Sequence, residues 1–98
     1  MPDGDPRAAR ILDEVRAIPR GFVRAYSDVE PGAPRVVGRV LATTHEEVPW
    51  HRVVRADGSP AAGHEAEALR RHRREGTALT ASGTRLDMSR ARWHPDED

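Results

Sequence analysis

The absence of cysteine from a chain of 98 residues is the feature that most limits how this protein can fold. A domain of this size buries only roughly 60–65% of the surface that its unfolded chain exposes, and small domains usually supplement such a core with disulfides or a structural metal. Without cysteine the chain can form neither a disulfide nor a zinc site of the finger type, so packing alone must stabilise it. The chain also has no thiolate, which excludes every thiol-dependent enzyme class.

Length and hydrophobicity indicate one soluble domain, residues 1–98. The longest apolar stretches are only a few residues long, and residues 1–5 have neither the basic nor the apolar region of a secretory signal. We therefore expect a cytoplasmic protein without membrane contacts. We also expect flexible ends at residues 1–5 and at residues 95–98, which are polar and acidic.

Charge is distributed unevenly along the chain, although the net charge is zero. Residues 16–56 carry seven arginines against four acidic residues, whereas residues 1–15 carry two against four and residues 57–98 seven against eight. Because phosphate neutralisation supplies most non-specific DNA affinity, this basic middle segment is compatible with a nucleic-acid partner. Every basic residue is arginine, which suits bidentate phosphate contacts, although a GC-rich genome would give the same bias.

Two capping patterns predict helices in the first half of the chain. Asp5 before Pro6 is a typical helix start. The apolar face of this first helix consists of Ile11, Leu12, Val15 and Ile18. Pro34 opens a second helix that runs to about residue 43. Between the two helices we expect a short extended piece at residues 22–23 and a single helical turn at residues 27–30.

The second half of the chain predicts a strand, a helix and a hairpin. Val53–Arg55 reads as a strand that enters a tight turn at Asp57-Gly58. A helix is expected over Glu65–Glu75, closed by Gly76. Its inward-facing apolar residues are expected to be Ala66 and Leu69. A closing hairpin is expected from Leu79, Leu86, Met88 and Trp93. The predicted fold is therefore mainly α, a small winged helix-turn-helix-like domain with a short C-terminal β-hairpin.

The segment Val48-Pro49-Trp50-His51-Arg52-Val53-Val54 carries the strongest functional indication. It resembles the active-site motif Pro-Cys-His-Arg-Val in the C-terminal domain of the O6-alkylguanine-DNA alkyltransferases, with tryptophan at the cysteine position. That substitution resembles the alkyltransferase-like proteins. The similarity extends over about residues 8–76. The other segments that carry it are Ile18–Gly21, Tyr26, Pro34–Arg39, Arg55–Gly58 and Arg74–Gly76.

The resemblance implies a DNA-binding role for Tyr26, Arg35 and Gly38, and the position of Arg39 on the same helical face adds a fourth residue. Arg35 matches the arginine finger that enters the duplex through the minor groove and fills the gap left by an extruded base; its planar guanidinium can stack there and offset part of the unstacking cost. Tyr26 matches the tyrosine that crowds the 3′ phosphate and helps to rotate the nucleotide. Gly38 would allow close approach to the DNA backbone, and Arg39, on the same helical face as Arg35, would contact a phosphate.

Simpler structural roles remain open for these residues. Arg35 and Arg39 could be a solvated surface pair, Gly38 could serve tight helix packing, and Tyr26 could be an ordinary half-buried ring. Tyr26 and Arg35 are only nine residues apart, several fewer than is usual in the family. We therefore expect the first helix of the motif to be truncated to a single turn.

The resemblance also implies a lesion pocket and a structural pair. Trp50 would form the pocket floor, where its indole can pack against a flipped purine, although it could instead belong to the core. Val53 and Ser59 complete the expected pocket, with residues 57–63 as its lid. His51 and Glu75 match the proton-relay pair of the active enzymes and, without a thiol, are expected to form a buried structural hydrogen bond. Arg52 would tie the motif to a carboxylate.

The function that the resemblance implies is non-enzymatic recognition of O6-alkylguanine in double-stranded DNA, followed by handover to nucleotide excision repair factors. The expected partner is thus damaged duplex DNA, bound by a monomer in the cytoplasm. No cofactor is expected, and no metal, because His45, His51, His64, His72 and His94 lack ligand spacing. The alternatives are a winged-helix DNA-binding or transcription-regulating domain without lesion specificity, and a protein-interaction domain that no longer binds DNA.

Overall fold

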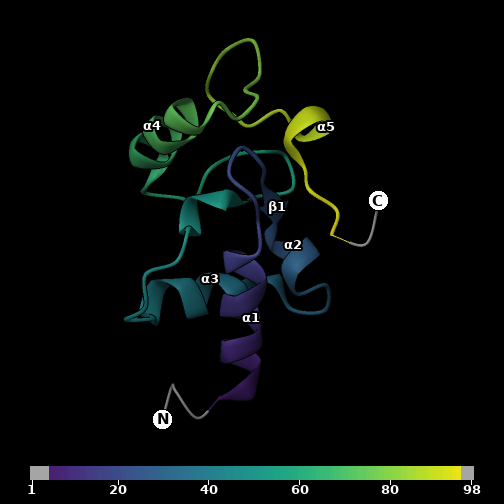
Figure 1. Cartoon of the computed structure of the whole chain (residues 1–98), viewed down its shortest axis with the longest axis vertical. Coiled ribbons are helices and arrows are strands. Elements are labelled where there is room, and N and C mark those ends of the chain that lie inside the picture. Colours follow the sequence, from purple (N-terminus) through teal and green to yellow (C-terminus); the bar gives the residue numbers. More distant parts are fainter. Residues whose placement is uncertain (1–4, 96–98) are drawn as a thin grey trace.

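The structure, a computed structural model, describes residues 5–95 as six short helices and two strands (Figure 1). In chain order these are α1 (Pro6–Arg16), β1 (Arg24–Ala25), α2 (Tyr26–Val29), α3 (Pro34–Thr43), a 3-10 helix (Trp50–Arg52), β2 (Val53–Val54), α4 (Glu65–Glu75) and α5 (Met88–Ala91). The expected flexibility of residues 1–4 and 96–98 concerns positions outside the described residues. Within residues 5–95, no helix is long and apolar enough to cross a membrane.

The helix starts follow the sequence prediction because they depend on local capping. The Asp5 carboxylate accepts hydrogen bonds from the backbone N–H groups of Arg7 and Ala8, which would otherwise lack partners at the start of α1. Pro34 occupies the first position of α3, where its missing N–H costs nothing. The single helical turn expected near residues 27–30 is α2, shifted by one residue.

Helices α1, α2 and α3 pack around the first of two apolar clusters. Its buried members are Ile11, Val15, Ile18, Val29, Val37 and Val53. Ile18 lies beyond the end of α1, yet it is buried with the helix face that it was expected to continue. The core thus lies directly behind α2 and α3, and it fixes the position of both.

The two strands form a minimal parallel sheet in which Arg24 pairs with Val53 and Ala25 with Val54. The extended piece lies at residues 24–25 rather than at 22–23, although Val23 makes a bridge to Arg92 just before it. The second apolar cluster consists of Val23, Val54, Leu86 and Ala91. It joins this sheet to the C-terminal part of the chain.

Helix α4 has the predicted limits but a different inward face. Gly76 closes it with a φ of +73°, a left-handed conformation that favours glycine. The buried residues are Ala68 and His72, four positions apart on one face, whereas Ala66 is exposed. Ala66 cannot share that face, because it is two positions before Ala68, and side chains two positions apart in a helix point in directions that differ by about 200°. Leu69 packs partly buried against the second cluster, as expected.

The expected C-terminal hairpin is reduced to one antiparallel bridge between Leu79 and Leu86. The prediction that Met88 and Trp93 belong to it was wrong. The Asp87 side chain accepts a hydrogen bond from the Ser89 N–H and thereby caps α5, so that Met88 begins a helical turn. Trp93 packs against the first cluster instead. The fold class is confirmed as mainly helical, with a two-stranded sheet that is parallel.

Candidate nucleic-acid interface

The four residues expected to contact DNA line one hollow of about 380 Å³ at the N-terminal end of α3. Tyr26 is the first residue of α2, and Arg35, Gly38 and Arg39 belong to α3. The complete lining is Tyr26, Pro34, Arg35, Gly38, Arg39, Arg55 and Ala62. Short local segments therefore bring together every residue to which the sequence assigned a DNA contact.

Gly38 faces the ring of Tyr26, and packing within the protein does not require a glycine at this position. A Cβ atom added at Gly38 would lie 3.9 Å from Tyr26 Cε1, an ordinary contact distance. Apart from the chain neighbours of Gly38 and the backbone of α3 itself, no atom of the described residues would lie nearer. Tight packing within the chain therefore does not explain the glycine. The missing side chain instead leaves the hollow open to an external partner.

Tyr26 is half-buried beside a positive charge. Burial raises the pKa of its phenol. The positive charge of Arg55 acts to lower this pKa but does not cancel the rise. The hydroxyl consequently stays protonated at neutral pH and can donate a hydrogen bond. A neutral phenol can approach a phosphate without charge repulsion.

Three arginines around the hollow form no ion pair with the carboxylates that the structure describes. Arg35, Arg39 and Arg55 are exposed, and none forms an ion pair within residues 5–95. Sequence reasoning did not assign Arg55 to the site. The signal that could have placed Arg55 in the site is its position directly after β2. Strand β2 pairs in parallel with β1, and Tyr26 directly follows β1, so the pairing places Arg55 beside Tyr26.

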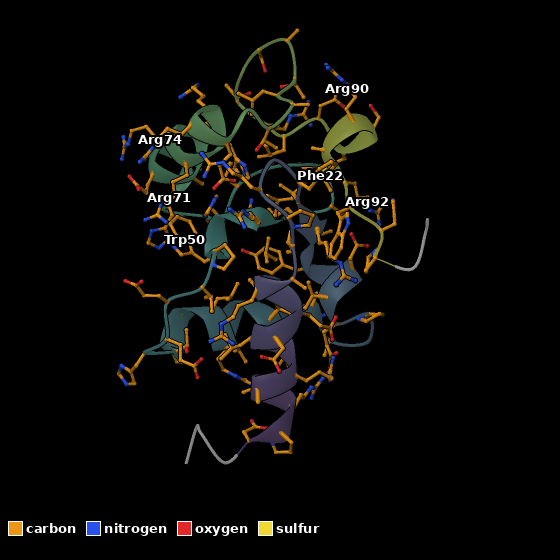
Figure 2. The ribbon with its side chains drawn as sticks, viewed as in Figure 1. Phe22, Trp50, Arg71, Arg74, Arg90 and Arg92 are labelled. Carbon is orange, nitrogen blue, oxygen red and sulfur yellow. The ribbon has the colours of Figure 1, made fainter. Side chains whose placement is uncertain are left out.

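Trp50 lies in a second hollow, of about 540 Å³, near the C-terminal end of α3. The guanidinium of Arg71 lies 5.3 Å from the centroid of the indole ring, close enough for a cation–π interaction. Figure 2 shows the two side chains next to each other, with Arg71 projecting from α4. The ring of His64 packs edge-on at 5.6 Å. Trp50 is therefore partly buried in a cluster of its own, and it does not line the hollow of Tyr26 and Arg35.

Two other expected pocket residues lie elsewhere. Val53 has an exposed fraction of 0% and packs inside the first apolar cluster, so its side chain offers no surface to a ligand. Ser59 lies in the turn after β2, where its N–H donates to the Asp57 carboxylate and its carbonyl accepts from the Arg55 N–H. It lines neither hollow. The segment expected as the lid reaches the first hollow through Ala62.

The motif around Trp50 is held by a buried network centred on Glu75. Arg52 donates two hydrogen bonds to the Glu75 carboxylate, from Nε at 3.1 Å and from Nη2 at 2.9 Å, and a third from Nη1 to the Ile18 carbonyl. His51 Nε2 lies 2.9 Å from the same carboxylate. Burial acts to raise the pKa of Glu75, but the bonds from Arg52 and His51 outweigh it and lower that pKa to about 2.

The protonation of His51 follows from these contacts. Burial lowers the pKa of His51 more than Glu75 raises it, so the ring is neutral at pH 7. Because the Glu75 carboxylate can only accept, the single ring proton is on Nε2. Nδ1 is then a buried acceptor, without a hydrogen-bond partner in the described part of the chain.

His72 holds the Trp50 motif through the backbone of His51, a role that the sequence did not predict. Its ring is fully buried, with Nε2 2.7 Å from the His51 carbonyl and Nδ1 2.9 Å from the Thr77 hydroxyl. Burial lowers its pKa, so His72 is neutral, donates from Nε2 to the carbonyl and accepts at Nδ1 from Thr77. Only the spacing of four from Ala68 could have indicated its inward orientation. Within residues 5–95, no group of three or more histidine and acidic residues is placed to hold a metal ion.

Comparison with known proteins gives the family. A model described as 6-O-methylguanine DNA methyltransferase, DNA binding domain, matches residues 6–77, well over half of the chain. The DNA base-flipping proteins of Escherichia coli (strain K12) and Shigella flexneri are each 36% identical to it over 106 residues, which cover 96% of this chain and 79% of each relative. The chain belongs to the alkyltransferase-like family.

The solved structures of alkyltransferase-like proteins agree with this assignment. The crystal structure of S. pombe Atl1 in complex with damaged DNA containing O6-carboxymethylguanine superposes with a TM-score of 0.78 at 26% identity, covering 91% of this chain and 95% of the other. S. pombe ATL in complex with DNA gives 0.75 at 28% identity, covering 90% and 94%. The present alkyltransferase-like chain has no cysteine and carries Trp50 at the position of the motif cysteine.

Proposed function

We propose that this protein recognises O6-alkylguanine in duplex DNA by binding the minor groove and extruding the damaged nucleotide, without chemical reaction. The observation that carries the proposal is the single hollow that collects Tyr26, Arg35, Gly38 and Arg39, whose arginines form no ion pair within residues 5–95. The names of the relatives support it, since one is a DNA base-flipping protein and another is bound to damaged DNA. With no thiolate available, the alkyl group stays on the guanine.

Binding begins with the phosphates. Arg39 and Arg55 are exposed and form no ion pair with the described residues 5–95, so they can contact two backbone phosphates without first breaking such a pair. Gly38 lets α3 approach the backbone closely, and the neutral phenol of Tyr26, held beside it, presses on the phosphate 3′ to the lesion. These contacts position the protein and carry no sequence information.

Extrusion then depends on Arg35. Removing a base from the stack costs a few kcal/mol, and a planar guanidinium that enters the vacancy restores part of the stacking. Arg35 is suited to this role because it lies in the first turn of α3, is exposed, and has no internal partner within residues 5–95. Arg35 makes this contact only when a base has left the duplex. Because the damaged nucleotide is the one that is extruded, the contact favours damaged sites over undamaged ones.

The extruded base is received by the Trp50 segment. The indole offers a flat apolar surface for a purine and its alkyl group, and it can leave its edge-on contact with His64 to do so. The network of Arg52, His51 and Glu75 holds the segment rigid and performs no proton transfer. We further propose that the bound complex marks the lesion for nucleotide excision repair factors.

The test is a pair of duplexes of one sequence, with guanine or O6-methylguanine at the same position, titrated with the protein in a gel-shift assay. Preference for the alkylated duplex supports the proposal. Equal binding would identify a winged-helix DNA-binding domain without lesion specificity, and no binding would favour a protein-interaction domain. Recovery of a labelled methyl group on the protein would contradict the non-enzymatic part of the proposal.

A further inference from the structure

The helical turn that carries Tyr26 is too short to be stable by itself. Helix α2 contains four residues, and its closing backbone hydrogen bond runs from the Glu30 N–H to the Tyr26 carbonyl at 3.1 Å. A first helical turn is unfavourable because it fixes several backbone angles for one hydrogen bond. Other parts of the molecule must therefore keep Tyr26 in place.

Asp28 is the point at which α2 is held. One of its carboxylate oxygens accepts a hydrogen bond from the Ala25 N–H at 2.9 Å, which caps the start of the turn. Arg92 donates Nε to the same oxygen at 2.9 Å and Nη2 to the other oxygen, a bidentate ion pair. The Asp28 side chain is only 16% exposed. Arg24 completes the contacts, with Nη2 2.7 Å from the Asp28 carbonyl.

Arg92 is itself fixed by the backbone of the C-terminal segment. The Val23 N–H donates to the Ala91 carbonyl at 2.9 Å, and the Trp93 N–H donates to the Val23 carbonyl at 2.8 Å. Residues 91–93 thus lie alongside the chain just before β1, and the Trp93 ring packs against the first apolar cluster. Figure 1 shows this segment descending from α5 toward α2, and Figure 2 shows Arg92 on it.

We propose that the C-terminal segment Ala91–Trp93 is a brace that positions Tyr26 for nucleotide rotation, with Arg92 as the positioning residue. The brace rests on the proposed function and adds residues outside the matched family region, 6–77. It acts through a chain of contacts: Arg92 holds the Asp28 carboxylate, the carboxylate holds the Ala25 N–H, and Tyr26 follows directly. The brace compensates for the short distance between Tyr26 and Arg35, which leaves room for only one helical turn.

The test compares Arg92→Ala and Arg92→Lys with Arg90→Ala as the matched control. Arg90 is exposed in α5, projects away from α2 in Figure 2, and forms no ion pair within residues 5–95. Amide hydrogen exchange of the free protein, measured by NMR, reports the stability of α2. Titration of the guanine and O6-methylguanine duplexes reports lesion preference.

For Arg92→Ala we expect faster exchange at residues 25–30 but not in α1, and a lesion preference reduced about 2- to 5-fold. Arg92→Lys should restore part of both because it keeps the charge but not the bidentate geometry, and Arg90→Ala should match the wild type. Unchanged exchange at residues 25–30 would overturn the brace without any DNA. Faster exchange with the lesion preference of the wild type would overturn the positioning role. Equal binding of both duplexes by the wild type would overturn lesion recognition itself, and the positioning role with it.

Discussion

Arg35 is the residue whose substitution best separates lesion recognition from general DNA binding. In the proposed complex it fills the space of the extruded base, so Arg35→Ala removes a contact that undamaged duplex makes far less often. From stacking contributions of about 1–3 kcal/mol, affinity for an O6-methylguanine duplex should fall roughly 5- to 150-fold. Affinity for the guanine duplex should fall less, and the salt slope should decrease by at most about one unit.

Arg39→Ala is the matched control, because Arg39 lies one helical turn away on the same hollow and is assigned a phosphate contact. It should weaken both duplexes about equally. Both variants are titrated against both duplexes by fluorescence anisotropy at two salt concentrations. An equal loss on both duplexes for Arg35→Ala would make Arg35 another phosphate contact.

Trp50 provides an optical signal for the base-binding step. In a Trp93→Phe background Trp50 is the only tryptophan, and a purine stacked on it should quench its emission. We expect quenching that saturates with O6-methylguanine duplex and is much weaker with guanine duplex. Emission that stays constant while the duplex binds to saturation would place Trp50 outside the base pocket.

At the scale of elements, the buried network beneath the Trp50 motif predicts how stability depends on pH. Burial lowers the pKa values of His51 and His72, so the unfolded chain takes up their protons first, and stability decreases as the pH falls through about 6.5. The pKa of Glu75 is lowered from 4.5 to about 2, so its contribution is present above pH 4.5 and is lost between pH 4.5 and 2. Urea unfolding followed by circular dichroism, at pH values on both sides of each window, measures both steps.

Glu75→Gln should reduce the second step, to which other carboxylates with lowered pKa values such as Glu67 also contribute. It should also lower the free energy of unfolding at pH 7 by about 3 kcal/mol, because it leaves Arg52 without a carboxylate at a site where Glu75 is 8% exposed. Glu67→Gln is the matched control in the same helix. Glu67 also pairs with two arginines but is 37% exposed, and solvent screens those pairs.

The histidine prediction has its own contrary outcome. A free energy of unfolding that is constant from pH 7 to pH 4 would contradict the pKa shifts assigned to His51 and His72.

The elements that could be predicted from the sequence are those formed by interactions between residues close together in the chain. Asp5, Pro34 and Gly76 act on the backbone next to them, so the starts of α1 and α3 and the end of α4 could be predicted. The C-terminal hairpin was not, because Asp87 could cap a helical turn as well as end a strand, and Trp93 finds its partners in a cluster built from residues 11–53.

The same limit applies to the site. Tyr26, Arg35, Gly38 and Arg39 were predicted to contact DNA, and neighbouring helices bring these four residues together; the DNA contacts stay a prediction. The motif did not identify Arg55, Arg71 or Arg92, whose roles arise from contacts with Tyr26, Trp50 and Asp28 across the fold. The burial of the Val53 side chain in the first cluster was not predicted, because the sequence of a motif does not show which of its residues face the core.

At the scale of the whole molecule, arginine has two separate uses. Within residues 5–95, eight arginines form ion pairs with carboxylates. Some of these pairs lie inside one helix, such as Arg71 with Glu67, and others join separate segments, such as Arg10 with Glu30 and Arg92 with Asp28. The arginines around the first hollow form no ion pair in the part of the chain that the structure describes. A chain of zero net charge can therefore present a basic surface for DNA, because seven of its acidic residues form ion pairs with other arginines within residues 5–95.

Base extrusion is the central claim, and the most direct measurement is the fluorescence of 2-aminopurine placed next to O6-methylguanine in a duplex. Stacked 2-aminopurine is quenched, so removal of its neighbour from the stack should raise its emission as the protein binds. We predict a rise that saturates with the alkylated duplex, that is much smaller when guanine replaces the lesion, and that is reduced when Tyr26 is changed to phenylalanine. Saturated binding to the alkylated duplex with no rise in emission would contradict the account.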